Sequence, residues 1–364
     1  MKTLLFVLTF LLSENLHSQS TLSPKERDNK TVNLLSKYPK EIAEIIFSQS
    51  KDFPNNTQLS IAIIENGETG YYGIIKENDT LKPTENQKKI FEIGSITKVF
   101  TSTILASLVE NKKINLTDEI NSYYSFAFKD NTKINFESLA NHTSGLPRLP
   151  ENLDLSSEIN PYKNYGKPEI EQYLKNLVKL GNKTYSYSNL GTGLLGYTLG
   201  LSQKTTFQNL LKKIIFDKYK MKNSFTSSHN LGISIIKGLN KKGEIVSNWD
   251  FDVLFGAGGI LSTTEDLVLF ANAQFNPKNR ELELTRKTTI EIKGNTKIGL
   301  GWHKLEFKNG KDLLWHNGGT GGYSSSIVMK VEEKMAVIIL SNVSDINVQI
   351  DALSYELINK TNKK

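Results

Sequence analysis

Hydrophobic residues follow a strand-like pattern near both ends of the chain. The apolar segments 59–64 and 70–75 flank Asn66 and Gly67, a pair typical of the tight turn of a β-hairpin. Short apolar runs return late in the sequence, and a charged segment at 330–334 predicts a turn between the last two of them. These late runs predict strands at 298–302, 313–315, 323–331 and 335–340.

Helical spacing dominates the middle of the chain. The segment 95–109 places Ile104, Leu105 and Leu108 on one face, as expected for a helix that packs on a core. Similar patterns predict helices at 34–47 with an interruption at Pro39, and at 136–139, 170–178, 190–201, 207–216, 264–273 and 346–358.

This distribution of strands and helices predicts an α/β (α+β) architecture. The economical fold is one antiparallel sheet built from both chain ends, flanked by helices, with a mainly helical lobe inserted. We expect the sheet lobe to take about 30–115 and 290–364, and the helical lobe about 116–289. The space between sheet and insert is a natural place for a binding site.

The first residues have the pattern of an export signal. Lys2 precedes the apolar run 4–12, which is shorter than the roughly 20 residues needed to span a bilayer. A buried N-terminal helix is the alternative, but no apolar stripe or cap accompanies the run. We expect a signal peptide at 1–18 cleaved near Ser18, no permanent membrane span, and a periplasmic or secreted domain at 19–364.

Composition narrows the chemistry. The chain has 364 residues, 45 Lys and Arg, 38 Asp and Glu, and no cysteine. The absence of cysteine excludes thiol nucleophiles, disulfides and cysteine-ligated metals. The net charge of +7 comes without a dense basic block, which argues against nucleic acid as a partner. Five unclustered histidines indicate no metal site, and we expect no cofactor and a monomeric protein.

One apparent motif is better explained by packing. The segment from Gly191 to Gly196 matches the dinucleotide fingerprint G-x-G-x-x-G, but polar residues precede it instead of a buried strand. We therefore interpret Gly193, Gly196 and Gly200 as the small face of a closely packed helix.

A Ser-x-x-Lys pattern at Ser95 and Lys98 stands in a more informative context. A short strand pattern ends at Gly94, and Ser95 then opens a helix, so Lys98 lies on the same helical face as the serine. A serine hydroxyl is a weak nucleophile that needs a base beside it, and a helix N-terminus favours a developing oxyanion. The alternative is a capping serine with a solvated lysine. The same spacing at 48–51 and 234–237 lacks this context.

Two further patterns add candidate residues. Tyr187 and Asn189 form a Tyr-x-Asn triplet before the glycine-faced helix, where a tyrosine near an ammonium group can shuttle protons and an amide can bind a substrate amide. A second match at 162–164 lies in a polar loop. Near the C-terminus, His316 begins a glycine-rich run containing Gly318 and Gly319, whose backbone can approach a ligand closely. A packing tyrosine and a long hairpin turn are the corresponding structural alternatives.

The ordered set resembles the serine β-lactamase and penicillin-binding-protein superfamily, and more closely its class C β-lactamase and D-alanyl-D-alanine peptidase branch. The likeness covers roughly 55–345. Further matching segments are Phe91-Glu-Ile-Gly-Ser-Ile-Thr-Lys98, Leu139-Ala-Asn-His-Thr-Ser-Gly-Leu-Pro147, Gly256-Ala-Gly-Gly-Ile-Leu-Ser-Thr263 with Asp266, Gly299-Leu-Gly-Trp302 and Leu340-Ser-Asn342.

The resemblance implies roles for these residues. Ser95 would form an acyl-enzyme, Lys98 and Tyr187 would share the base and acid work, and Asn189 would hold the substrate amide. The N–H groups of Ser95 and Gly319 would form the oxyanion hole. His316 would replace the family's usual third-motif lysine, with its charge helping Tyr187 to lose a proton.

The third motif also departs from the family pattern. It reads His-Asn-Gly-Gly instead of Lys-Thr-Gly, so a group that titrates near neutrality replaces a permanent cation. Asn317 lacks the threonine hydroxyl that would fit a substrate carboxylate. The sequence therefore predicts an exported serine hydrolase acting on β-lactams or D-Ala-D-Ala-type peptidoglycan ends. An esterase of the same fold and a catalytically silent cell-wall peptide-binding homologue are the alternatives.

Overall fold

The structure is a computed structural model that describes residues 31–156, 159–229, 231, 235–307 and 312–360. The predicted signal peptide and its cleavage site lie outside the described residues. Among those described, no helix combines the length and the apolar character needed to cross a membrane.

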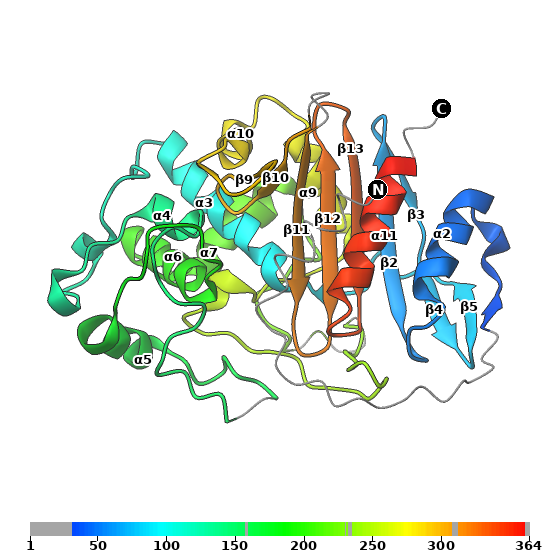
Figure 1. The fold of residues 1–364 in the computed structure, drawn as a ribbon, viewed down its shortest axis with the longest axis horizontal. Helices are drawn as coiled ribbons and strands as arrows, with labels where there is room; N and C mark the ends of the chain where they lie inside the picture. Colours follow the sequence, from blue (N-terminus) through cyan, green and yellow to red (C-terminus); the bar gives the residue numbers. More distant parts are fainter. Residues whose placement is uncertain (1–30, 157–158, 230, 232–234, 308–311, 361–364) are drawn as a thin grey trace.

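One large sheet joins the two ends of the chain (Figure 1). Its strand order is β1-β5-β4-β2-β13-β12-β11-β10-β9-β8, with β3 also paired to β2. The strands are β1 Val32–Asn33, β2 Gln58–Glu65, β3 Glu68–Tyr71, β4 Ile74–Glu77, β5 Thr80–Pro83, β8 Ile290–Glu291, β9 Thr296–Ile298, β10 His303–Leu305, β11 Leu313–Gly319, β12 Ser324–Lys330 and β13 Met335–Ser341. Early and late strands meet where β2 pairs antiparallel with β13, which confirms the predicted fold class.

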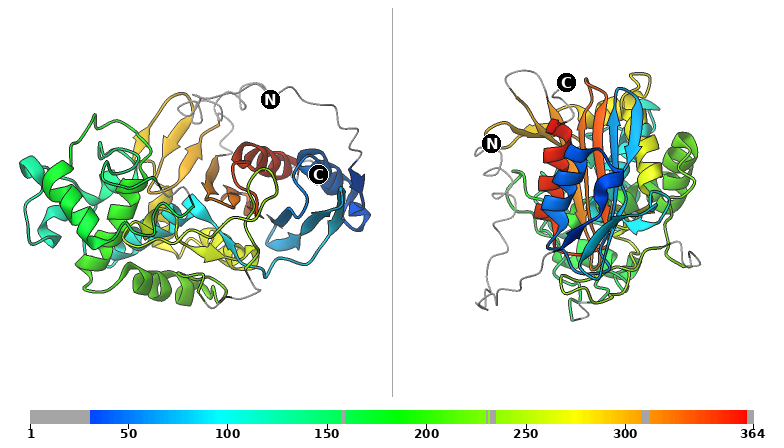
Figure 2. Two further views of the ribbon diagram at one scale, coloured as in Figure 1. Left: turned by 90° about the horizontal axis from the view of Figure 1, so that it is seen from below. Right: turned by 90° about the vertical axis from the view of Figure 1, so that its right-hand side faces the viewer.

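The sheet is buried on both faces, which explains the unbroken apolar runs of its central strands. Side chains alternate along β2, so that Ala62 and Ile64 enter one core whereas Ile61 and Ile63 enter the other. Helices α2 Lys40–Ser50 and α11 Asn347–Lys360 cover one face, and α9 Thr264–Gln274 packs on β2 and β13 from the other (Figure 2).

The helical lobe lies beyond α3 Thr97–Glu110, the helix that leads away from the sheet (Figure 1). The remaining helices are α4 Phe136–Ala140, α5 Lys167–Gln172, α6 Asn189–Ser202, α7 Phe207–Leu210, α8 Asp217–Tyr219 and α10 Arg280–Arg286, with π-helical turns at Tyr173–Leu177 and Leu211–Phe216. The glycines of α6 serve close packing, because a Cβ on Gly193 would lie 2.6 Å from the Leu254 side chain. This contact confirms the packing interpretation of that motif.

Two strand predictions near the site need correction. The predicted strand 298–302 is interrupted, because β9 ends at Ile298 and a turn closed by a hydrogen bond from Gly299 N to Trp302 O precedes β10. Strand β11 continues beyond the predicted end at Trp315 to Gly319, because Gly318 and Gly319 still pair with β12. The hairpin β4–β5 and helix α10 were not predicted.

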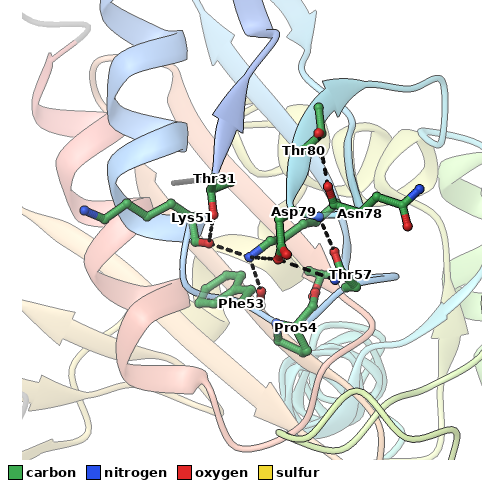
Figure 3. A network of polar contacts seen from close by, with 10 residues as sticks. Thr31, Lys51, Phe53, Pro54, Thr57, Asn78, Asp79 and Thr80 are labelled. Carbon is green, nitrogen blue, oxygen red and sulfur yellow. Dashed lines mark hydrogen bonds and ion pairs between the residues drawn. The ribbon is translucent and has the colours of Figure 1, made fainter. Parts of the chain in front are cut away.

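A buried lysine, Lys76, links the outer strands of the sheet to the end of α2, where Figure 3 labels its neighbours Lys51 and Phe53. Lys76 is 5% exposed, and its Nζ donates hydrogen bonds to the carbonyl oxygens of Lys51, at 2.6 Å, and Phe53, at 2.8 Å. The carboxylate of Asp79 lies 3.7 Å away, and the Thr31 hydroxyl donates to the same Lys51 carbonyl. This network stabilises the side of the sheet that is remote from the helical lobe.

Candidate active site

Ser95 lies in a short connection between a two-stranded sheet and a long helix. Strand β6 Phe91–Glu92 pairs with β7 Leu261–Ser262, and a 3₁₀ turn at Gly94–Ile96 then leads directly into α3. Gly94 adopts a positive φ of 52°, which a glycine reaches without strain. The turn leaves Ser95 half-buried at the N-terminal end of α3, where the helix dipole favours negative charge.

Lys98 reaches Ser95 from the first turn of α3, as its spacing predicts. Its side chain is fully buried, and its Nζ lies 3.0 Å from Ser95 Oγ while donating a 2.7 Å hydrogen bond to the Ala257 carbonyl. Burial lowers the pKa of Lys98 well below its ordinary value, and the positive charge of Arg148 lowers it further. The environment therefore favours a neutral amine, whose lone pair can accept the proton of the serine hydroxyl.

Tyr187 lies against both members of this pair. Lys98 Nζ is 4.8 Å from the centroid of the Tyr187 ring. Burial raises the pKa of Tyr187 to about 12, although a hydrogen bond with Ser95 and the charge of Arg148 act in the opposite direction. The phenol is therefore protonated at neutral pH, so that Lys98 is better suited to the role of base and Tyr187 to that of acid.

Asn189 begins helix α6 two residues after Tyr187. Its Nδ2 donates a 3.3 Å hydrogen bond to the hydroxyl of Tyr162, while its Oδ1 is buried and has no partner among the described residues. A buried acceptor without a donor is costly, and an incoming amide N–H would satisfy it. Tyr162, which the sequence places in an unremarkable polar loop, thus supports Asn189.

The glycine-rich end of β11 packs directly on the nucleophile turn. A Cβ on Gly94 would lie 2.7 Å from Gly319 N, and a Cβ on Gly318 would lie 2.9 Å from Ser95 N. Gly319 is exposed, and β10 pairs with β11 only as far as Trp315, so this edge of β11 has no neighbouring strand among the described residues. The amides of Ser95 and Gly319 are thus near one another, as an oxyanion hole requires.

His316 differs from the role that the sequence suggests. Its side chain is 1% exposed, and its Nδ1 lies 2.6 Å from the Asn317 carbonyl oxygen. Burial lowers the pKa of His316 well below its ordinary value, and the neighbouring His303 and Lys98 add to the effect. The expectation that His316 carries a charge near neutrality is therefore wrong. The ring lies 6.4 Å from that of Tyr187, centroid to centroid, as a neutral neighbour.

Asn317 faces away from the nucleophile. Its Nδ2 donates a 2.6 Å hydrogen bond to the carboxyl group of Asp351 on α11. Asn347, on the same helix, donates from Nδ2 to the carbonyl of Gly318 at 2.7 Å. Helix α11 therefore fixes the glycine run from behind, a contact that no local pattern in the sequence reveals.

Three residues near the site were not predicted as functional. His142 accepts a 3.2 Å hydrogen bond from Ser188 N at Nδ1, and its ring lies 4.7 Å from the Tyr187 ring. His303 pairs through Nε2 with the Tyr185 hydroxyl at 2.9 Å. Arg148 places its guanidinium carbon 5.3 Å from the centroid of Tyr187. His142 lies in the segment 139–147, and Arg148 directly follows it. The likeness of this segment to the family was the only sequence signal for either residue.

Comparisons with known proteins identify the family of this chain. The family model described as Beta-lactamase matches residues 55–356. The chain belongs to the β-lactamase family. Among its relatives, a β-lactamase of Pseudomonas fluorescens is 28% identical over 268 residues, covering 70% of this chain and 72% of the relative. Protein flp of Staphylococcus aureus strain MRSA252 is 24% identical over 326 residues, covering 82% of this chain but 62% of the relative.

Solved structures with the β-lactamase fold superpose over most of the chain. A class C β-lactamase gives a TM-score of 0.74 at 22% identity, covering 91% of this chain and 98% of that one. A β-lactamase/D-alanine carboxypeptidase from Pseudomonas syringae gives a TM-score of 0.72 at 20% identity, covering 88% and 97%. These likenesses establish the fold. Within the described residues, no group of three or more His, Asp or Glu side chains is arranged to bind a metal ion.

Proposed function

We propose that this member of the β-lactamase family is a serine hydrolase that forms an acyl-enzyme on Ser95 and cleaves β-lactams or D-Ala-D-Ala-type peptides. The observation that carries the proposal is the fully buried Lys98, whose Nζ lies 3.0 Å from Ser95 Oγ. A lysine kept neutral beside a serine hydroxyl is the base that such a nucleophile needs. The names of the P. fluorescens and P. syringae relatives support the same substrate classes.

The geometry suggests the following acylation step. Lys98 takes the proton of the Ser95 hydroxyl while Oγ bonds to the substrate carbonyl carbon, and the negative oxygen is held by the N–H groups of Ser95 and Gly319. The C–N bond then breaks, and Tyr187 gives its proton to the departing nitrogen. Lys98 returns its proton to Tyr187, which leaves an acyl-serine and a free amine.

The second step releases the acyl group. Lys98, again neutral, takes a proton from a water molecule that attacks the acyl carbon. The Ser95 oxygen leaves and takes this proton from Lys98, which restores the resting site and yields a carboxylic acid. Asn189 contributes by offering its buried, unpartnered Oδ1 to a substrate N–H group.

An ester substrate is the second candidate. The observation in its favour is that His316 is neutral and Asn317 is engaged by Asp351, so β11 presents no permanent cation to a substrate carboxylate. A catalytically silent peptide-binding protein is disfavoured because Ser95, Lys98 and Tyr187 are assembled at close range.

Rates on three substrates distinguish these functions. The mature chain is assayed on nitrocefin, an N-acylated D-Ala-D-Ala peptide and a p-nitrophenyl ester, with intact-mass analysis for a covalent adduct and Ser95→Ala as the blank. We expect an adduct on the wild-type chain, and turnover of the β-lactam or the peptide. Turnover of the ester alone would identify an esterase. Neither turnover nor an adduct on any substrate would overturn the proposal.

Export rests on the sequence pattern of residues 1–18 and is part of the proposal. Cell fractionation with N-terminal sequencing tests it directly. We expect a mature N-terminus close to residue 19 outside the cytoplasm, and an intact N-terminus in the cytoplasmic fraction would contradict it.

A further inference from the structure

The reacting groups lie next to a cation that the proposed mechanism does not use. Arg148 places its guanidinium carbon 5.3 Å from the centroid of the Tyr187 ring, and its charge lowers the pKa of that tyrosine. Lys98 also approaches this ring, but its burial favours the neutral form. Strand β11 offers a neutral His316, whose ring lies 6.4 Å from that of Tyr187, centroid to centroid. Of the groups named here, Arg148 therefore supplies the positive charge beside Tyr187.

The backbone at Arg148 is firmly placed relative to Tyr187. The Arg148 carbonyl accepts hydrogen bonds from the backbone N–H groups of Asn189, at 3.0 Å, and Leu190, at 3.1 Å. The preceding Pro147 carbonyl accepts a 2.6 Å hydrogen bond from the Ser188 hydroxyl. The arginine thus stays beside the Tyr-x-Asn triplet by contacts that do not involve its side chain.

The guanidinium group itself is available to a ligand. Arg148 is exposed, and the structure records no ion pair or side-chain hydrogen bond between its guanidinium and any described residue. Other exposed basic residues do have acidic neighbours, as Arg280 shows with Glu110 at 3.1 Å. A planar guanidinium with free donors matches the two oxygens of a carboxylate.

We propose that Arg148 binds the carboxylate of the leaving group and thereby determines specificity for acidic leaving groups. This inference rests on the proposed function, in which Tyr187 protonates the departing atom. In a terminal D-amino acid or the corresponding hydroxy acid, the carboxylate carbon lies two bonds from that atom, roughly 2.5 Å away. A leaving group that takes its proton from the Tyr187 hydroxyl thus holds its carboxylate close to this ring, whose centroid lies 5.3 Å from the Arg148 guanidinium carbon.

With Arg148 in this role, the site can recognise an acidic substrate without a cation on β11. The Asn317 amide is held by Asp351, so in this proposal the group that receives negative charge lies in the loop that precedes Tyr187 and not on β11. Because the guanidinium is exposed, its attraction for a carboxylate weakens as salt screens the charges.

The test compares two esters that differ only in the charge of the leaving group. One is an N-acyl-D-alanyl ester of D-lactic acid with a free carboxylate, and the other is the same compound as its lactate methyl ester. The value of kcat/KM is measured for wild type, Arg148→Gln and Arg148→Lys, and for Arg280→Gln as a control arginine remote from Ser95. A charge-assisted hydrogen bond contributes enough to change a rate by about 10- to 100-fold.

We expect Arg148→Gln to lose about 10- to 100-fold on the free acid and less than about 3-fold on the methyl ester. Arg148→Lys should recover part of the loss, and Arg280→Gln should behave like wild type. Added salt should reduce the wild-type preference for the acid and leave Arg148→Gln unaffected. Equal losses on both esters, or no loss on either, would overturn the proposed role of Arg148 but not the proposed function. A wild-type chain that cleaves neither ester and forms no acyl adduct would instead remove the proposed function.

Discussion

Lys98 Nζ lies 3.0 Å from Ser95 Oγ at the end of a side chain with no exposed surface. The same nitrogen donates to the Ala257 carbonyl, so one of its hydrogens is directed away from the serine. In the neutral form, the amine can then turn its lone pair toward the serine hydroxyl. Burial thus makes a base available at this position, because a fully hydrated lysine would be protonated and could not accept the serine proton.

Removal of the nucleophile is the first prediction. Ser95→Ala should lower kcat on the best substrate by a factor on the order of 10⁶. The matched control is Ser48→Ala, which alters the exposed serine of another Ser-x-x-Lys pattern and should retain wild-type activity. Steady-state kinetics and intact-mass analysis measure both effects. Residual activity of Ser95→Ala within about 10-fold of wild type would refute the assignment of the nucleophile.

The pH dependence of kcat/KM should report the Lys98 amine. The active form is neutral, so activity is present above the pKa of Lys98 and is lost as the pH falls through it. Because burial lowers that pKa well below its ordinary value of 10.5, activity should persist far below pH 10. Tyr187, with a pKa raised to about 12, should remain protonated throughout. A rate profile from pH 5 to 10 should therefore show one rising limb and no fall on the alkaline side.

The variant His316→Asn tests whether the rising limb of the pH profile comes from His316 instead of Lys98. The asparagine cannot titrate but retains a donor for the Asn317 carbonyl. Since burial lowers the pKa of His316 well below 6.5, the rising limb should keep its position in this variant. If the rising limb disappears in His316→Asn, the group that titrates is His316 and not Lys98.

The sequence predicts the nucleophile turn because its signals are local. Ser95 and Lys98 are three residues apart on one helix, and the strand-like segment before Gly94 is visible in the chain. The environment of His316 is different, because its burial results from tertiary packing, with His303 on β10 and Tyr187 as ring neighbours. Residue type alone suggests a histidine that charges near neutrality, and only the tertiary structure shows that it stays neutral.

The contacts of Arg148 could not be predicted from the sequence pattern either. Its position beside Tyr187 depends on backbone hydrogen bonds between the segment 147–148 and the start of α6, about forty residues later in the chain. Sequence periodicity carries no information about such loop-to-helix pairing. The same reason explains why Tyr162, which supports Asn189, resembles an ordinary loop residue.

Gly318 allows β11 to approach the nucleophile turn. A Cβ at this position would collide with the Ile93 carbonyl oxygen and would lie 2.9 Å from Ser95 N. Gly318→Ala should therefore push the strand away from the oxyanion site, with a loss of activity of about 10²-fold or more. Gly181→Ala is the control, because its Cβ would meet only the Gly145 carbonyl at 3.5 Å. Equal activity of the two variants would show that close approach at Gly318 is dispensable.

Glu92 should make stability depend on pH. It is buried, and although Asn248 and Trp249 donate hydrogen bonds to it, burial raises its pKa from 4.5 to about 7. Between these values this carboxyl group binds more protons in the folded chain than in the unfolded chain, so its contribution to stability falls as the pH rises from about 4.5 to 7. Asp351, whose pKa burial also raises to about 7, acts in the same direction.

His316 and Lys98, whose pKa values burial lowers, act in the opposite direction, so the contribution of Glu92 is measured as a difference between variants. The melting temperature at pH 5.5 minus that at pH 7.5 should be smaller in Glu92→Gln than in wild type, because the amide has no charge to bury, whereas the exposed Glu68→Gln should leave it unchanged. Thermal melts at both pH values measure the effect. An unaltered difference in Glu92→Gln would exclude Glu92 as a source of the dependence.

Lys76 offers a test of stability that is independent of catalysis. Lys76→Met removes two hydrogen bonds from a buried ammonium group and leaves the Phe53 carbonyl without that donor, so it should cost about 2–3 kcal/mol of unfolding free energy. Lys82→Met removes only a surface ion pair with Glu77 and should cost less than about 1 kcal/mol. Strands β2, β13 and β12 separate β4 from β11, so the folded fraction of either variant should keep its kcat. Urea unfolding and activity per folded molecule measure the two quantities, and a cost for Lys76→Met no greater than for Lys82→Met would show that the network is not stabilising.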